Sequence, residues 1–201
     1  MTTHMLLPAA DRTWKPWKNG GGEMADIAVV PSDAGYDDFK WRIAIARIDV
    51  DRPFSDFPGI DRTIMIVGGK GLNLSVEGMA PARLTHKSPP FSFPGDKPTQ
   101  AQLIDGPVHA LNVMTKRGVA DTRIGLADGP AQFDTGGDVH AMVVWARGRA
   151  DVTVNGESVA LGQHDALMLA IGVHVEIKPE DHSHGWLIEV GVRRVASQPA
   201  A

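Results

Sequence analysis

The chain has 201 residues, of which 43% are hydrophobic and 22% charged, with a net charge of -4 and a pI near 6.0. This composition is that of a globular protein with a sizeable core, and it excludes wholesale disorder and the basic surface that nucleic-acid binding needs. The absence of cysteine excludes disulfides, thiolate nucleophiles and cysteine-ligated metal sites.

The sequence also argues against a membrane or secreted location. No stretch approaches the roughly 20 consecutive apolar residues of a membrane-spanning helix. Residues 1–7 lack the charged and apolar regions of a secretory signal. We therefore expect a cytoplasmic protein with neither a membrane nor a nucleic-acid partner.

Short apolar alternations bounded by glycine and proline run along the chain. In the first, residues 41–48, the bulky residues take one face of a strand and the small or charged ones take the other. Residues 63–67 and 71–76 follow, around a glycine-containing turn typical of a hairpin. Many short strands predict an all-β sandwich or barrel, with a mixed α+β domain as the alternative. Further strands are predicted at 141–146, 150–154, 166–170, 174–178 and 186–192.

The predicted hairpin recurs in the second half of the chain. Residues 64–78 can be placed on residues 142–156 without gaps, although two of the fifteen positions are identical and chance convergence is the alternative. A repeat predicts two copies of one barrel: an N-terminal barrel with the ligand pocket in residues 1–126 and a C-terminal barrel in residues 127–201. The polar, glycine-rich stretch 127–138 would be the exposed boundary.

Residues 17–22, Trp-Lys-Asn-Gly-Gly-Gly, place an aromatic and two polar residues before three glycines. Glycine tolerates positive φ and lets the backbone approach a ligand, so this turn could offer N–H groups to an anion. A flexible turn without a ligand is the alternative. No Gly-Lys-Ser/Thr follows, so the segment is not a P-loop.

Arg42 lies in mid-strand on the face that it shares with Ala44 and Ala46. In a barrel one strand face looks inward, and small residues there leave room for a cavity. An arginine at the wall of that cavity would present a rigid fork that matches a carboxylate. The alternatives are an Arg42 that points to solvent from an edge strand, or one that pairs with an internal Asp.

Residues 54–62 combine aromatic side chains, which can wall a pocket, with charged ones, which can orient a polar ligand. Asp61 and Arg62 are adjacent in a strand, so they point to opposite faces and only one can enter a cavity. A structural turn with a surface charge pair is the alternative. The predicted site has Arg42 as the carboxylate-binding residue, Trp17, Phe57 and Phe91 as walls, and Lys18, Asn19, Arg62 and Asn112 as polar contacts.

Several segments, in one order along the chain, resemble the HutD/Ves family. The resemblance implies a double-stranded β-helix (cupin) fold with two tandem barrels, a bicupin, in a cytoplasmic bacterial protein. It also implies binding of a pathway intermediate such as N-formylglutamate and modulation of histidine utilisation. Ala110 departs from the family, which usually has an acidic residue there, so either the ligand differs or His109 compensates. The matching segments are 16–23 with Ile27, Trp41 and Arg42 with their strand, 53–62, 90–96 and 106–115.

The histidines do not follow the pattern of a metal-binding cupin, which has a His-x-His pair and a Glu before its central glycine turn. The corresponding residues 54–61 contain no histidine, and His140 stands alone in the second half. His182-x-His184 lies in a polar stretch that we interpret as an exposed loop. No nucleophile elbow occurs either. We therefore predict neither a metal nor another cofactor.

These observations favour a protein that binds a small anionic metabolite over an enzyme. A cupin enzyme acting on a small organic acid, with or without a metal, is the second interpretation, and it needs a metal or a general base inside the barrel. A scaffold is the third, because exposed strand edges would allow a homodimer.

Overall fold

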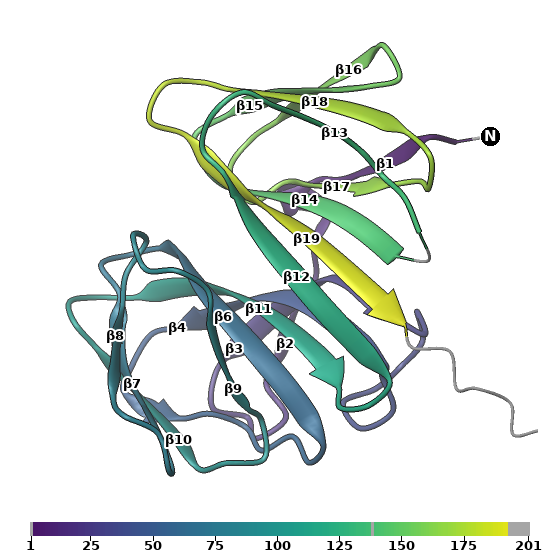
Figure 1. Ribbon diagram of the computed structural model, residues 1–201. Helices are drawn as coiled ribbons and strands as arrows, with labels where there is room; N and C mark the ends of the chain where they lie inside the picture. Colours follow the sequence, from purple (N-terminus) through teal and green to yellow (C-terminus); the bar gives the residue numbers. More distant parts are fainter. Residues whose placement is uncertain (1, 138, 193–201) are drawn as a thin grey trace, which may run out of the picture.

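The computed structural model describes residues 2–137 and 139–192. Within them the chain consists of antiparallel β-strands and one short 3-10 turn, η1 (Ala9–Asp11), near the start. The strands form two lobes, one above the other in Figure 1, and each lobe contains a larger and a smaller sheet. The predicted all-β fold is confirmed.

The first barrel, the lower lobe of Figure 1, contains strands β2 to β11. Its larger sheet has the order β2 (Trp14–Pro16), β3 (Glu23–Val30), β4 (Trp41–Ile48), β11 (Val108–Lys116), β6 (Ile60–Gly68), β9 (Phe91–Pro94). Its smaller sheet has the order β5 (Arg52–Pro53), β10 (Thr99–Leu103), β7 (Leu72–Val76), β8 (Ala82–Leu84).

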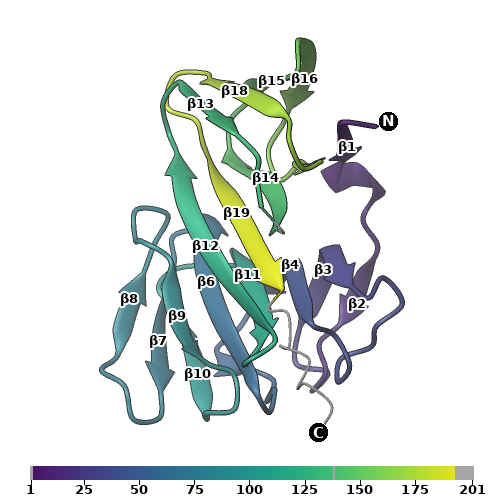
Figure 2. The same ribbon diagram turned by 45° about the vertical axis from the view of Figure 1, so that its right-hand side comes forward.

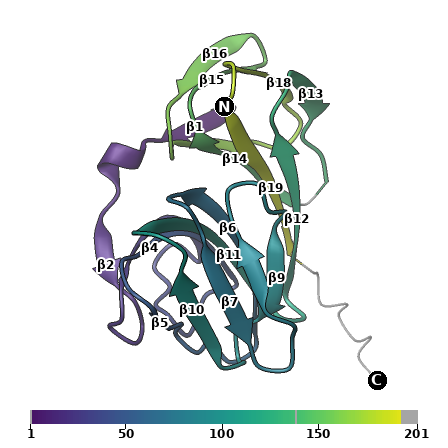
Figure 3. The same cartoon turned by 90° about the vertical axis from the view of Figure 1, so that its left-hand side faces the viewer.

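The second barrel contains β12 to β19 together with β1, which pairs with β17. The N-terminal segment therefore runs from the second barrel to the first, as Figure 3 shows. The larger sheet has the order β1 (His4–Leu7), β17 (Ala166–Leu169), β14 (Val139–Arg147), β19 (His184–Val192), β12 (Ala120–Ala127). The smaller sheet has the order β13 (Ala131–Asp134), β18 (His174–Pro179), β15 (Ala150–Val154), β16 (Glu157–Leu161).

In the two larger sheets, side chains on opposite faces of a strand belong to different hydrophobic cores. On β4, Ala44 and Ala46 face the interior of the first barrel, whereas Ile43 and Ile45 pack against the second barrel. Ile188 on β19 meets them from the other side, so the two larger sheets lie back to back (Figure 2). A strand buried on both faces carries apolar residues on both, which explains the nearly continuous apolar run of β4.

The predicted hairpin at residues 63–76 is wrong. The two strands, β6 and β7, lie in different sheets: β6 pairs with β11 and β9, and β7 with β10 and β8. The intervening glycine turn therefore carries the chain from one sheet of the barrel to the other. Gly71 fits this role because a Cβ on it would lie 2.1 Å from the carbonyl oxygen of Leu84.

The gap-free alignment of residues 64–78 with residues 142–156 is also wrong, because it is shifted by one residue in its first strand. Ile64 faces the interior of the first barrel, but Met142, its partner in that alignment, packs between the barrels. The connection from β14 to β15 is one residue shorter than that from β6 to β7. Because strand faces alternate with every residue, a single deletion exchanges the two faces.

The change from the first to the second barrel does not coincide with the predicted boundary at residue 127. Strand β12 already pairs with β19 along its whole length, so the strands change sheets at the turn between β11 and β12. The stretch predicted as an exposed loop also contains β13.

Candidate functional site

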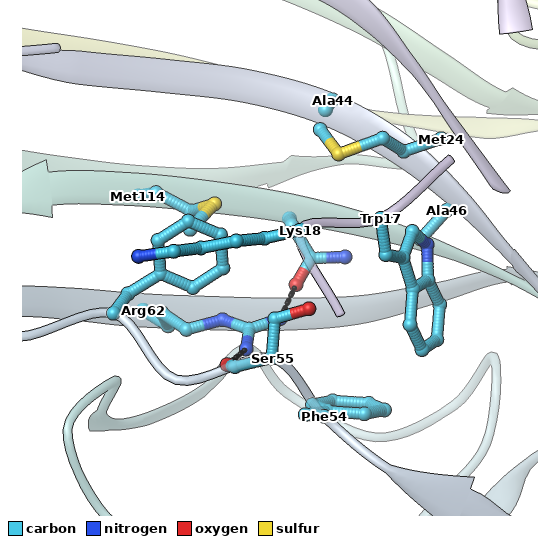
Figure 4. Close-up of a pocket in the computed structure, with 11 residues that line it drawn as sticks. Trp17, Lys18, Met24, Ala44, Ala46, Phe54, Ser55, Arg62 and Met114 are labelled. Atoms are coloured by element: carbon cyan, nitrogen blue, oxygen red, sulfur yellow. Dashed lines mark hydrogen bonds between the residues drawn. The ribbon is translucent and has the colours of Figure 1, made fainter. Parts of the chain in front are cut away.

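A pocket in the first barrel lies between one face of the larger sheet and two connecting segments, residues 17–18 and 54–57 (Figure 4). The volume of its cavity is about 30 Å³, which is room for roughly two waters. A larger ligand therefore requires side chains at the entrance to move. The lining residues are Trp17, Lys18, Met24, Ala44, Ala46, Phe54, Ser55, Phe57, Arg62, Asn112 and Met114.

The space exists because β4 contributes only methyl groups to this face. Ala44 lies opposite Asn112 on β11, and Ala46 lies two residues further along β4. Larger aliphatic residues at these two positions would fill the volume, as they do on the opposite face of β4. The prediction that small residues on β4 leave room inside the barrel agrees with this geometry.

Arg62 is the charged group at the base of the pocket, and it is 7% exposed. Its Nη2 donates to Asn112 Oδ1 at 2.8 Å and its Nη1 to the Ser55 carbonyl oxygen at 3.4 Å, while its buried Nε has no partner. None of the ion pairs in the described part of the chain includes Arg62. Burial lowers the pKa of Arg62 to about 10, so the guanidinium stays charged at neutral pH.

Aromatic rings surround this guanidinium. Its Cζ lies 4.9 Å, 5.6 Å and 5.1 Å from the ring centroids of Phe54, Phe57 and Phe93. Cation–π contacts of this kind contribute about 0.5–2 kcal/mol each, which does not replace the hydration that burial removes. A buried arginine with donors to spare is therefore suited to an anion from outside.

Asn112 and Ser55 add further donors beside Arg62. Asn112 Nδ2 donates one hydrogen to the Ala110 carbonyl at 3.3 Å and has a second. Ser55 Oγ accepts the Asn19 N–H at 3.2 Å, which leaves its own hydrogen free to donate. Together the three side chains can hold the two oxygens of a carboxylate.

The glycine turn at residues 20–22 does not form the predicted anion nest, because two of its three N–H groups are bonded within the protein. Gly20 N donates to the Trp17 carbonyl at 2.8 Å, and Gly21 N donates to Asn19 Oδ1 at 3.0 Å. A Cβ on Gly22 would lie 2.8 Å from the Trp17 indole, so glycine is required there for close packing. These internal bonds agree with the alternative in so far as it is a turn without a ligand.

The prediction that Arg42 faces the hollow is wrong, and the alternative of pairing with an internal Asp holds. The side chain is fully buried; its Nε lies 3.4 Å from Asp26 Oδ1, and its Nη2 donates to the carbonyls of Ala34 and Gly35 at 3.2 and 2.8 Å. Arg42 and Arg62 flank Met114 in the sheet and share its face. The cluster of Phe39, Phe57, Ile60 and Met114 lies beside that strand position, and the 31–40 loop covers Arg42.

The structure brings most of the other predicted site residues together. Trp17, Lys18, Phe57, Arg62 and Asn112 line one pocket. Asn19 lies outside it and donates through Nδ2 to the Pro53 carbonyl at 3.3 Å. Phe91 also lies outside it and packs on Phe93 in the barrel core, with the two ring centroids 6.2 Å apart. The sequence interpretation missed the lining residues Met24, Phe54, Ser55 and Met114, of which Phe54 and Ser55 belong to the segment that contains Phe57.

Ala110 and His109 occupy opposite faces of β11. Ala110 is fully buried in the first-barrel core, whereas the half-buried His109 ring lies against His164 of the second barrel, 5.6 Å away. Neither residue lines the pocket, so the expectation that His109 compensates there for Ala110 is wrong.

The other histidines lie away from the pocket. His182 is exposed, as predicted, but half-buried His184 begins β19 and lines a groove with His86 between the barrels. In residues 2–137 and 139–192 no three His, Asp or Glu side chains converge as metal ligands would. Over the same residues no helix is long and apolar enough to cross a membrane.

Comparison with known proteins gives a consistent result along most of the chain. A family model described as HutD matches residues 9–187. An uncharacterised 21.2 kDa protein from the hutC 3' region of Pseudomonas putida is 31% identical over 170 residues, which cover 84% of this chain and 88% of that protein. Protein Ves of Citrobacter koseri is 35% identical over 114 residues, covering 56% of this chain and 58% of that protein.

Two solved structures define the fold relationship. HutD from Pseudomonas fluorescens SBW25 (formate condition) has a TM-score of 0.80 at 30% identity and covers 95% of this chain and 100% of that chain. A cupin 2 conserved barrel domain protein from Leptotrichia buccalis has a TM-score of 0.52 at 9% identity, covering 77% and 84% of the two chains. The second likeness concerns the fold alone, and the predicted cupin fold is confirmed.

Proposed function

Because the chain belongs to the HutD family, we propose that its first barrel binds a small carboxylate metabolite related to N-formylglutamate. Through that binding the protein would modulate histidine utilisation in the cytoplasm. The observation that carries the proposal is Arg62, a buried cation that lines the pocket and has no carboxylate partner in the described chain.

The physical argument is one of compensation. A buried charge loses its hydration and is stable only when other groups replace that hydration. Arg62 has one short hydrogen bond, to neutral Asn112. A carboxylate would supply the opposite charge and accept the remaining hydrogens in the bidentate geometry that guanidinium favours. The link to histidine utilisation draws on the relative from the hutC 3' region.

The remaining lining must contribute most of the affinity. A charge-assisted hydrogen bond contributes about 1.5–3 kcal/mol, whereas micromolar binding requires about 8 kcal/mol. The apolar walls, from Trp17 to Met114, can supply the difference by burying the carbon skeleton of the ligand.

The second interpretation, a cupin enzyme, fits this pocket less well. The lining residues include no Asp, Glu or His to act as a general base. Binding without turnover is therefore the function that the pocket supports better.

Calorimetric titration with N-formyl-L-glutamate tests the proposal. Replacing Arg62 by methionine keeps the size of the side chain and removes its charge, so affinity should fall about ten- to a hundredfold. Arg47→Met is the matched control, because Arg47 is exposed and, among the residues that the structure describes, forms its ion pair with Asp49 on the outside of the barrel. Equal affinity of Arg62→Met and the unmodified protein would contradict the proposed pocket.

A further inference from the structure

Two cations flank one aromatic ring in the pocket. The Lys18 Nζ lies 5.5 Å from the Phe57 ring centroid and the Arg62 Cζ lies 5.6 Å from the same centroid. The two charges are therefore at most about 11 Å apart. In the view of Figure 4 the Lys18 side chain runs across the pocket between Met114 and Arg62.

The two cations differ in their partners. Arg62 is buried, and no carboxylate of residues 2–137 and 139–192 forms an ion pair with it. Lys18, with 31% of its side chain exposed, forms an ion pair with Asp37. Asp37 belongs to the loop between β3 and β4, and its side chain is 78% exposed. An ion pair as exposed as this one is weak and exchanges readily.

We propose that Lys18 is the second anion-binding residue of the pocket and that Asp37 competes with the ligand for it. This inference rests on the proposed function and assigns the residue that binds the second carboxylate of such a ligand. A ligand that spans both cations carries two carboxylates on a short chain, one at Arg62 and one at Lys18. Asp37 then lowers the affinity for dicarboxylates without affecting monocarboxylates, which reach only Arg62.

Affinities of glutarate and valerate, which have the same chain length, separate the two contacts. Calorimetry should show tighter binding of glutarate to the unmodified protein. Lys18→Gln should lower glutarate affinity to that of valerate. Asp37→Asn should raise glutarate affinity about two- to fivefold, the range expected for loss of an exposed ion pair, and leave valerate unchanged.

Two further variants decide between competition and a general charge effect. Asp33→Asn removes an exposed carboxylate from the same loop, and none of the ion pairs of residues 2–137 and 139–192 includes Asp33, so it should change glutarate affinity by less than Asp37→Asn does. The double variant of Lys18→Gln with Asp37→Asn should match Lys18→Gln alone, because Asp37 acts through Lys18.

The outcomes separate this inference from the proposed function. Carboxylate binding that depends on Arg62 but is equal for glutarate and valerate would overturn the role of Lys18 and Asp37 alone. An equal gain for both ligands in Asp37→Asn would overturn the competition. Failure of both ligands and of N-formyl-L-glutamate to bind would overturn the pocket itself.

Discussion

The two barrels share one framework but fill it differently. The pairing of β6 with β11 and the pairing of β14 with β19 each contain one register shift, and these shifts align the two barrels. In this alignment Arg62 of β6 corresponds to Ala141 of β14, and Asn112 of β11 corresponds to Leu187 of β19. Ala141 and Leu187 belong to an apolar cluster. The polar pair that makes a site in the first barrel is thus replaced by methyl and isobutyl groups in the second.

A tryptophan completes the difference. Trp145, fully buried in the second barrel, corresponds to Ile66 in the first. Its ring packs so closely on Gly185 that a Cβ there would lie 2.3 Å from it. In the first barrel the smaller isoleucine faces Ala110 instead. A few side chains on one scaffold therefore decide whether a barrel has an apolar core or a pocket lined by polar groups.

The largest expected effect tests the role of Trp145 as a core residue. Trp145→Ala should lower the free energy of unfolding by about 3–5 kcal/mol, because it opens a large cavity. Chemical denaturation measures this loss, with Trp14→Ala, a tryptophan 43% exposed, as the matched control. Carboxylate affinity of the folded fraction should not change. A loss of stability no larger than that of the control would show that the second barrel is not densely packed.

The two buried arginines of the first barrel sharpen the comparison between packing and binding. Arg42→Met should lower the free energy of unfolding by about 2 kcal/mol, because the carbonyls of Ala34 and Gly35 lose their donor and Asp26 loses a cation. Arg62→Met should change stability much less, since it removes a buried charge without a carboxylate partner.

Denaturation curves of both variants, with calorimetry of carboxylate binding, check this assignment. Arg42 should dominate stability and Arg62 should dominate affinity. A variant of Arg42 that folds normally but no longer binds carboxylates would reverse the assignment and restore Arg42 as the anion-binding residue.

The smallest expected effect concerns the contact between the barrels. Burial lowers the pKa of His109 and of His164, whose rings lie 5.6 Å apart. Among the nearby charges, Arg47 lowers and Asp49 raises the pKa of His109. Arg12 lowers and Asp165 raises the pKa of His164. The two histidines bind protons more readily in the unfolded chain than in the folded one. Their contribution to the free energy of unfolding is therefore fully present above about pH 6.5 and is lost as the pH falls through their lowered pKa values in the folded protein.

Denaturation between pH 7 and pH 5 measures this contribution. Replacing His109 and His164 together by glutamine should make the free energy of unfolding less dependent on pH over this range. His182→Gln, in an exposed turn, is the control and should leave the pH dependence unchanged. An equally steep pH dependence in the double variant would show that other groups cause the loss.

The sequence predicted the parts of the site that follow from local pattern. The segments 17–18 and 54–62, in which aromatic and charged residues are concentrated, contain six of the eleven lining residues. It did not predict the register of the repeat. One residue removed from a turn exchanges the faces of a strand, and strands that are apolar on both faces give no sign of which face is which.

By itself the sequence determined the all-β fold, since alternation at a period of two is a property of the chain. It also determined that an arginine would lie on the small-residue face of the first barrel. Only the tertiary structure decided which arginine lines the pocket. Arg42 and Arg62 flank the same methionine, but the 31–40 loop covers Arg42 and Asp26 lies beside it, whereas no carboxylate of residues 2–137 and 139–192 forms an ion pair with Arg62. The partners of a buried charge come from segments distant in the chain, and local pattern does not record them.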